Sequence, residues 1–209
     1  TRTSSSAASD VYKRQMEGSI FIAGAGVQWL RDRMKFFKKA PETEKIVKSL
    51  DNNNDIYLVP AFTGLGAPYW DANARGVLSG ITRDTSPKEI VRATIEAVAY
   101  QTFDLFEAMK HDGLRPKIVK VDGGMVMNNW FSQFLSDIVN VKVLRPKVQE
   151  TTALGAAFMA GLQIGVYKSL KNISKNWNLD KKFSPKMKNK SRTILIKGWE
   201  KAVKRALIN

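Results

Sequence analysis

The chain has 209 residues, of which 44% are hydrophobic and 25% charged, and this composition suits a globular protein with a buried core rather than a disordered one. It contains no cysteine and one histidine, which excludes disulfides, thiolate nucleophiles and zinc sites built from several Cys or His ligands. No apolar run approaches the roughly 20 residues of a bilayer span and no secretory signal pattern is present, so we expect a cytoplasmic protein with no membrane partner.

Residues 1–15 are serine-rich and lack hydrophobic periodicity, so we interpret them as a non-native or disordered leader. Residues 17–22 predict a short strand, and a small-residue turn containing Gly24 and Gly26 leads into a helix with apolar residues at helical spacing. Gln28 falls in the first turn of that helix, where its amide could face a ligand together with the backbone of the turn. The alternative is that the two glycines only let the helix pack closely on a sheet.

The middle of the chain predicts two strands and a long helix. Residues 56–62 and 76–82 are the strands, separated by a loop rich in glycine, proline and aromatic residues. Ser86 followed by proline and then Glu89 is the strongest helix-start signal in the chain, because the two side chains can satisfy each other's backbone N–H groups. The predicted helix runs to Lys110.

A glycine pair follows the next predicted strand, at residues 118–121. Gly123 and Gly124 remove two Cβ atoms at the turn, and helical spacing resumes at Asn128. Bare peptide groups at a strand-to-helix junction allow a nucleotide to approach closely and to meet free N–H donors. The alternative is an ordinary tight turn stabilised by Asp122.

The remaining segments complete an alternation of strands and helices. Residues 142–144 predict a strand and residues 151–165 a helix rich in alanine and glycine, which would permit close approach to a sheet or another helix. From residue 168 the chain is lysine-rich and loop-like until a final amphipathic helix at 191–207. The alternation predicts a layered α/β domain.

Positive charge is concentrated near the C-terminus. Residues 165–209 hold thirteen Lys or Arg side chains against Asp180 and Glu200, so eleven of the fifteen net charges lie there. Few aromatic residues are interleaved, and this pattern favours a solvated face over a nucleic-acid partner.

Five blocks in order carry a resemblance to a known family; they are GSIFIAGAGVQWLRD, YLVPAFTGLGAPYWDANARGVLSGITRD, IVRATIEAVAYQT, VDGGMVMNNWFSQFLSD and ETTALGAAFMAGL. Together they resemble the C-terminal half of the glycerol kinases, a branch of the carbohydrate kinase family with the actin and hexokinase ATPase fold. The resemblance implies an α/β, actin-like (ribonuclease H-like) ATPase domain whose mixed sheet is flanked by helices. We place this domain at residues 16–167, followed by a Lys-rich segment and terminal helix at 168–209.

The resemblance also implies an activity. Glycerol kinases transfer the γ-phosphate of ATP to glycerol in the presence of Mg²⁺, giving sn-glycerol 3-phosphate and ADP, with the nucleotide in a cleft between two domains. By resemblance, Gly24 and Gln28 match nucleotide contacts of the family, and Gly124 and Asn128 match its adenine-side contacts. Family members form dimers and tetramers, so a homo-oligomer is compatible with the resemblance.

Family members place the general base, the glycerol contacts and the magnesium carboxylate before the position of Glu17. We therefore assign no catalytic and no metal-binding residue here, and expect no turnover from the 209 residues alone. Asp71, Asp122 and Asp137 are interpreted as loop, cap and helix-surface residues, and His111 as the end of the long helix. Two alternatives stay open: another sugar or polyol kinase of the same family, and a basic interaction module.

Overall fold

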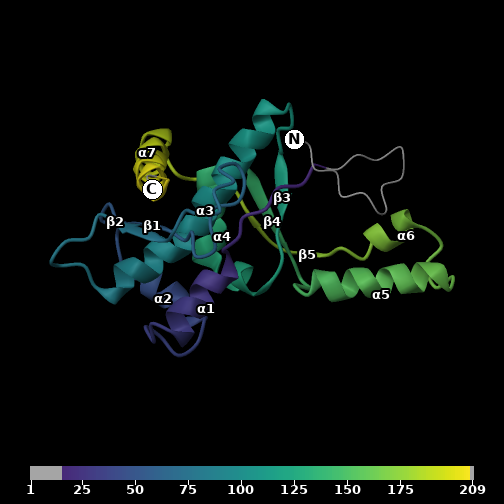
Figure 1. Cartoon of the computed structure of the whole chain (residues 1–209). Coiled ribbons are helices and arrows are strands. Elements are labelled where there is room, and N and C mark those ends of the chain that lie inside the picture. The colour runs from purple at the N-terminus through teal and green to yellow at the C-terminus, as the bar shows by residue number, and fades with distance from the viewer. Residues whose placement is uncertain (1–15, 208–209) are drawn as a thin grey trace.

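The computed structural model describes residues 16–207, so the predicted leader at 1–15 lies outside the described residues. In chain order the elements are α1 (Gly24–Asp32), α2 (Glu42–Lys48), β1 (Tyr57–Val59), β2 (Val77–Ser79), α3 (Pro87–His111), β3 (Ile118–Lys120), the 3-10 helix η1 (Gly124–Met127), α4 (Asn129–Val139), β4 (Lys142–Pro146), α5 (Thr151–Gln163), α6 (Leu170–Ser174), β5 (Leu179–Phe183) and α7 (Asn189–Ala206) (Figure 1). Strands β1 and β2 pair antiparallel. Strands β3 and β4 pair parallel and β4 and β5 antiparallel, which gives the predicted mixed sheet.

Helix α3 forms the centre of the fold, and its start is fixed by local sequence. The Ser86 hydroxyl accepts from the Lys88 N–H at 3.2 Å, while the Glu89 carboxylate accepts from the Ser86 N–H at 2.9 Å. This is the predicted capping box. Every residue from 91 to 101 is buried, although most helices bury only one face. Helix α3 is therefore enclosed by neighbours, with α1, α2, α4 and β1 all packed against it.

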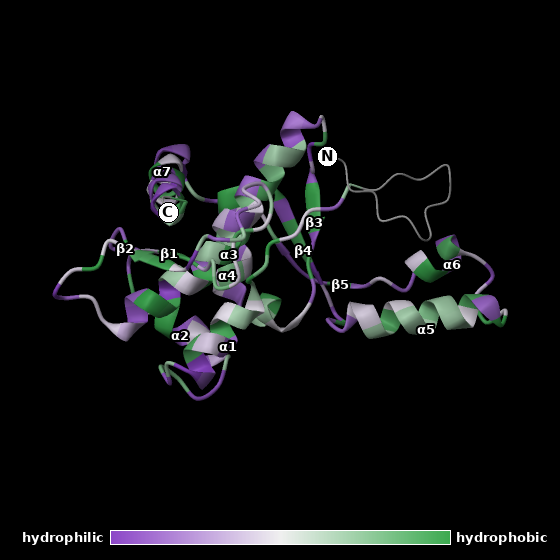
Figure 2. Cartoon of the chain, viewed as in Figure 1, coloured by the Kyte–Doolittle hydropathy of each residue, from purple (hydrophilic) through white to green (hydrophobic). Residues whose placement is uncertain are grey.

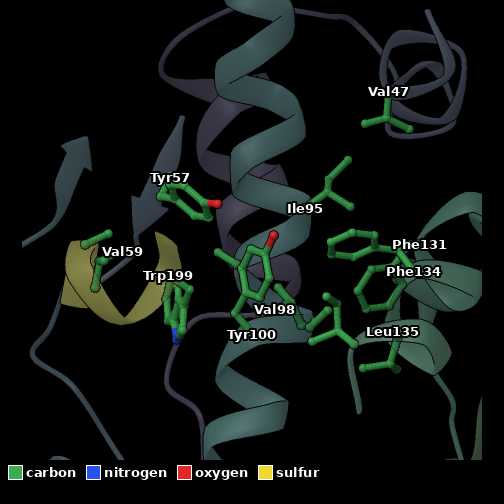
Figure 3. Close-up of a cluster of buried hydrophobic side chains, with 14 of the residues drawn as sticks. Val47, Tyr57, Val59, Ile95, Val98, Tyr100, Phe131, Phe134, Leu135 and Trp199 are labelled. Atoms are coloured by element: carbon green, nitrogen blue, oxygen red, sulfur yellow. The ribbon is translucent and has the colours of Figure 1, made fainter. Parts of the chain in front are cut away.

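The apolar core joins α3 to α4 and to the terminal helix α7 (Figure 3). Tyr100 of α3 lies between Trp199 of α7 and Phe134 of α4, with ring centroids 5.4 and 5.7 Å apart respectively. Trp199 is fully buried, and α7 also packs against β1 and β2. The terminal helix is thus part of the core despite its many lysines.

The predicted strand at residues 17–22 does not form. Residues 16–20 have no regular secondary structure, and one backbone hydrogen bond, from the Ala67 N–H to the Ser19 carbonyl at 3.1 Å, ties the segment to the body. A strand requires a ladder of such bonds to a neighbouring strand, and no other described strand lies beside this one. The apolar sequence of residues 17–22 is therefore not sufficient to form a strand without a pairing partner.

The Lys-rich segment is more regular than predicted. It contains α6 and β5, and the last helix begins at Asn189 rather than at residue 191. Strand β5 forms because its backbone pairs with β4 and because Phe183 at its end is buried. Helix α2 was also missed, although the acidic first turn after Pro41 is a typical helix start.

Helix α5 does not make the close packing that its small residues predict. It extends away from the body, and its surface is largely hydrophobic (Figure 2). No atom lies within 4 Å of the place where a Cβ of Gly155 would sit, and Met159 is 54% exposed. Gly161 alone among its glycines meets a neighbour, the ring of Tyr167.

Candidate functional site

The turn at residues 123–127, called here the glycine turn, connects β3 to α4. Gly123 adopts φ 84° and ψ 174°, a conformation that side chains disfavour. Gly124 is exposed and begins η1, and no atom lies within 4 Å of its Cβ position. The predicted order of strand, turn and helix is confirmed, with a 3-10 turn inserted before the helix. A ligand can approach Gly123 and Gly124 from the side of their Cβ positions, because no neighbouring atom of the described residues lies within 4 Å there.

Asn128 stands between the glycine turn and α4, and its side chain is already engaged. Its Oδ1 accepts from the Phe131 N–H at 3.0 Å and so caps α4. Its Nδ2 donates to the Thr43 hydroxyl at 3.3 Å, and the following residue, Asn129, donates its N–H to Glu44 at 3.3 Å. One N–H of the Asn128 amide remains available for a ligand, because an amide nitrogen carries two.

The second predicted junction is the start of α1. Gly24 is half-buried, its Cβ position is open, and Gln28 is exposed one turn further along the same face. At Gly26, in contrast, a Cβ would lie 3.0 Å from the Thr94 methyl group of α3. Close helix packing therefore explains Gly26 but not Gly24.

The four predicted nucleotide-binding residues fall into two pairs, each at a helix start. Helix α2 contacts the second pair through Thr43, which bonds Asn128, whereas α1 packs on α3. Within residues 16–207 no hydrogen bond joins Gly24 or Gln28 to either Gly124 or Asn128. That all four line one pocket stays a prediction.

Two surface hollows lie elsewhere. The larger, of about 820 Å³, is lined by residues 51–55, Arg92, Trp130, Gln133, Phe134, Asp137, Met187, Ser191, Ile194 and Leu195. In it the Arg92 guanidinium lies 5.1 Å from the centre of the Trp130 ring. The smaller, of about 520 Å³, lies beside α2 and is lined by Pro41, Glu44, Lys45, Lys48 and Ser49. Neither hollow includes any of the four predicted residues.

The strongly perturbed ionisable groups belong to the core rather than to the two junctions. Burial raises the pKa of Glu96, although Arg92 donates to it at 2.7 Å and Tyr100 at 3.0 Å. Burial also raises the pKa of Asp104 to about 6, opposed by hydrogen bonds from Trp199 and Tyr69. Glu96 bonds side chains of its own helix, α3, whereas Asp104 joins α3 to Trp199 of α7 and to Tyr69 of the loop before β2.

The three aspartates considered in the sequence have structural partners. Asp71 accepts from the N–H groups of Asn73 and Ala74 at 2.8 and 3.0 Å, as a loop residue does. Asp122 does not cap a helix; it accepts from the Thr151 hydroxyl at the start of α5. The expectation for Asp137 was wrong, because this residue is 9% exposed and accepts from the backbone of the segment before α7.

His111 is the last residue of α3, as predicted. Among the residues that the structure describes, no group of three or more His, Cys, Asp or Glu side chains could hold a metal ion.

Comparison with known proteins identifies relatives over most of the chain. Residues 5–164 match the C-terminal domain of the FGGY family of carbohydrate kinases. The chain is 55% identical to glycerol kinase 1 of Pseudomonas aeruginosa over 190 residues, covering 91% of this chain and 38% of that protein. It is 53% identical to glycerol kinase of Thermoanaerobacter pseudethanolicus over 193 residues, covering 92% of this chain and 39% of that protein.

Solved structures agree with the fold. A crystal structure of Plasmodium falciparum glycerol kinase with ADP matches with a TM-score of 0.80 and 38% identity, covering 91% of this chain and 38% of that one. A ligand-bound xylulose kinase from Lactobacillus acidophilus matches with a TM-score of 0.74 at 24% identity, which supports the fold alone. The actin-like α/β fold is thereby confirmed. The chain spans less than two fifths of the length of these relatives.

Proposed function

We propose that this chain, which belongs to the FGGY family of carbohydrate kinases, is the C-terminal, nucleotide-binding half of a glycerol kinase. In the full-length enzyme, ATP and glycerol would give sn-glycerol 3-phosphate and ADP. The observation that carries the proposal is the 55% identity to a glycerol kinase across 91% of the chain. A glycerol kinase with ADP is also similar to this chain in structure.

Within this half, we assign nucleotide binding to Gly24, Gln28, Gly124 and Asn128. The open Cβ positions of both glycines support the assignment, because a flat nucleotide can approach peptide groups that carry no side chain. The amides of Gln28 and Asn128 can bond neutral rings and hydroxyls without burying a charge. Asn128 would contribute one N–H, since its other polar atoms hold α4 and α2.

The phosphoryl-transfer machinery is proposed to lie in the other half. Phosphoryl transfer depends on holding donor, metal and acceptor in line, with little covalent chemistry by the protein. We place the Mg²⁺ ligands and the glycerol contacts in the N-terminal half, as the resemblance implies. The 209 residues alone are then expected to bind nucleotide without turning it over.

The exposure of α5 supports the view that this chain is part of a larger body. A helix of this length that is apolar on all sides is not stable in water and needs a covering partner. Met159 and Ile164, at the C-terminal half of α5 and just after it, are 54% and 77% exposed. We propose that the N-terminal half of the kinase covers them.

Location and assembly follow from the same proposal. None of the helices in residues 16–207 combines the length and apolar composition that crossing a bilayer requires. We propose a cytoplasmic enzyme, where its ATP is found, and a homo-oligomer as an assembly compatible with the family.

A chimera tests the activity. Residues 16–209 would be joined to the N-terminal part of Pseudomonas aeruginosa glycerol kinase 1, and ATP consumption measured with glycerol and with xylulose. We expect turnover with glycerol, and none from the 209-residue chain alone. A folded chimera that prefers xylulose would favour another sugar kinase, and one that phosphorylates neither would contradict the proposal.

A further inference from the structure

Arg145 of β4 lies buried directly beneath the end of the glycine turn. Its side chain is 7% exposed, and one terminal nitrogen donates to the carbonyls of Val126 at 2.8 Å and Met127 at 3.3 Å. The other terminal nitrogen lies 3.3 Å from Oδ1 of Asn129, the first residue of α4. One guanidinium group therefore bonds three successive parts of the chain between the glycine pair and the helix.

The other side of the same guanidinium is anchored in the sheet. Its Nε donates to Asp180 of β5 at 2.7 Å, and its central carbon lies 5.6 Å from the centre of the Phe183 ring. The Asp180 side chain is 39% exposed, so the pair sits at the boundary between core and solvent. A guanidinium group that bonds both a carboxylate and carbonyl oxygens has a fixed orientation. Arg145 therefore fixes the position of the glycine turn relative to the sheet.

The first two residues of the glycine turn have no side chain to hold them, whereas Val126 near its far end is 5% exposed and packs in the core. Gly123 and Gly124 have the widest backbone freedom of any residue type, and no described atom packs on the open side of either. The turn is hydrogen-bonded from below at both ends: the Gly123 N–H bonds the Gln149 carbonyl at 3.2 Å, and the Val126 carbonyl accepts from Arg145 at 2.8 Å and from the Ser132 hydroxyl at 2.9 Å. Ser132 bonds the Val126 carbonyl alone, whereas Arg145 also bonds Met127, Asn129 and, in the sheet, Asp180.

We infer that Arg145 is a positioning residue for the nucleotide site, which orients the peptide groups of the glycine turn for binding. The inference rests on the proposed function, because it assigns a task to the same turn. A lysine could not do this, since a single ammonium cannot span the positions of Val126, Asn129 and Asp180 at once.

The test uses the 209-residue chain with ADP as the probe. Arg145→Lys, Arg145→Met and Asp180→Asn would be compared with Arg192→Lys. Arg192 is the matched control, because it also bonds a carbonyl of α4, that of Ile138 at 2.7 Å, but at the opposite end of the helix. Titration calorimetry would measure ADP affinity, and hydrogen exchange would follow the amides of residues 123–129.

We expect Arg145→Lys to weaken ADP binding by about tenfold, the effect of roughly one lost hydrogen bond, and Arg145→Met to weaken it further. Exchange at the glycine turn should accelerate in both. Asp180→Asn keeps the Arg145 guanidinium but weakens its anchor, so its ADP affinity should lie between that of the Arg145 variants and that of wild type. This variant still tests the inference if Arg145→Met does not fold. Arg192→Lys should lower the melting temperature without changing ADP affinity.

Two results would overturn the inference, and they are distinguishable. Wild-type chain that binds ADP, with folded Arg145→Lys binding equally well, would remove the positioning role and leave the proposed function intact. Wild-type chain that binds no ADP would contradict the nucleotide site itself, and the role of Arg145 with it. A loss of affinity that Arg192→Lys shares in equal measure would show general destabilisation and would also count against the inference.

Discussion

Asp104 makes the stability of this domain depend on pH in a direction opposite to that of most carboxylates. It is 8% exposed, and both hydrogen bonds to it, from Trp199 at 2.7 Å and Tyr69 at 2.9 Å, reach the same oxygen, Oδ2. Burial raises its pKa from the ordinary 3.8 to about 6, while the two donors act in the opposite direction and Glu200 adds to the increase. The folded state therefore binds this proton more tightly than the unfolded state does.

The sign and size of the effect follow from linkage. The folded protein keeps the proton between pH 3.8 and about 6, so the stabilising contribution is complete below pH 3.8 and is lost as the pH rises through 6. With one pKa unit equal to about 1.4 kcal/mol, the loss amounts to about 3 kcal/mol. That is a large part of the roughly 5–15 kcal/mol by which domains are usually stable.

Replacing Asp104 by Asn isolates this contribution. The Asn oxygen can still accept from Trp199 and Tyr69, but the residue has no proton to lose. We expect the free energy of unfolding of wild type relative to Asp104→Asn to fall by about 2 kcal/mol between pH 4 and pH 7, because the unfolded carboxyl is already partly ionised at pH 4. Urea unfolding followed by tryptophan fluorescence at several pH values measures it.

Tyr69→Phe provides a second test of the same pH dependence. It removes one donor that favours the ionised carboxylate, so the midpoint of the pH dependence should move to higher pH. A wild-type curve parallel to that of Asp104→Asn across the range, or a midpoint that Tyr69→Phe moves downward, would refute the reasoning.

Three further experiments test the packing and the candidate site. Gly124→Val is expected to abolish ADP binding without loss of stability, because its Cβ position meets no atom within 4 Å; calorimetry and urea unfolding check the two parts, and unchanged affinity would contradict the assignment. Trp199→Ala should lower the free energy of unfolding by about 3–5 kcal/mol. Trp70→Ala, at a residue that is 66% exposed, should lower it by less than about 1 kcal/mol. Equal losses of the two variants in urea unfolding would place α7 outside the core. Gly198→Ala should destabilise the chain despite better helix propensity, because the new Cβ would overlap both the hydroxyl and two ring carbons of Tyr57. Tyr57→Phe in the same chain removes only the hydroxyl and should recover only part of the loss in a thermal melt, and full recovery would contradict the overlap with the ring.

Sequence reasoning succeeded where the signal is contained in a few neighbouring residues. The start of α3 was predicted because Ser86 and Glu89 satisfy each other's backbone groups and need no distant partner. The glycine turn was predicted for the same reason, since Gly123 requires a φ that other residues avoid. The capping role of Asn128 could have been found as well, because Asn directly before an apolar helix is a typical N-cap.

It failed where structure depends on distant partners. The apolar segment at 17–22 lacks a neighbouring strand and forms none, while the charged β5 forms one because β4 lies beside it. Arg145 was overlooked for a related reason. It follows the glycine turn by a full helix, and only the parallel pairing of β3 with β4 brings it beneath the turn.

At the candidate site, the start of α4 and the end of the glycine turn are held by hydrogen bonds, while the glycine backbone is open. Asn128 caps α4, Thr43 and Glu44 hold the helix start from α2, and Arg145 holds the turn from the sheet. The backbone of Gly123 and Gly124 is open to solvent, while the residues around it are held in place by these hydrogen bonds. Such an arrangement lowers the entropy lost when a nucleotide binds, because the protein groups are already placed. Under the proposed function, this half of the kinase would therefore hold its share of the nucleotide site in place by itself.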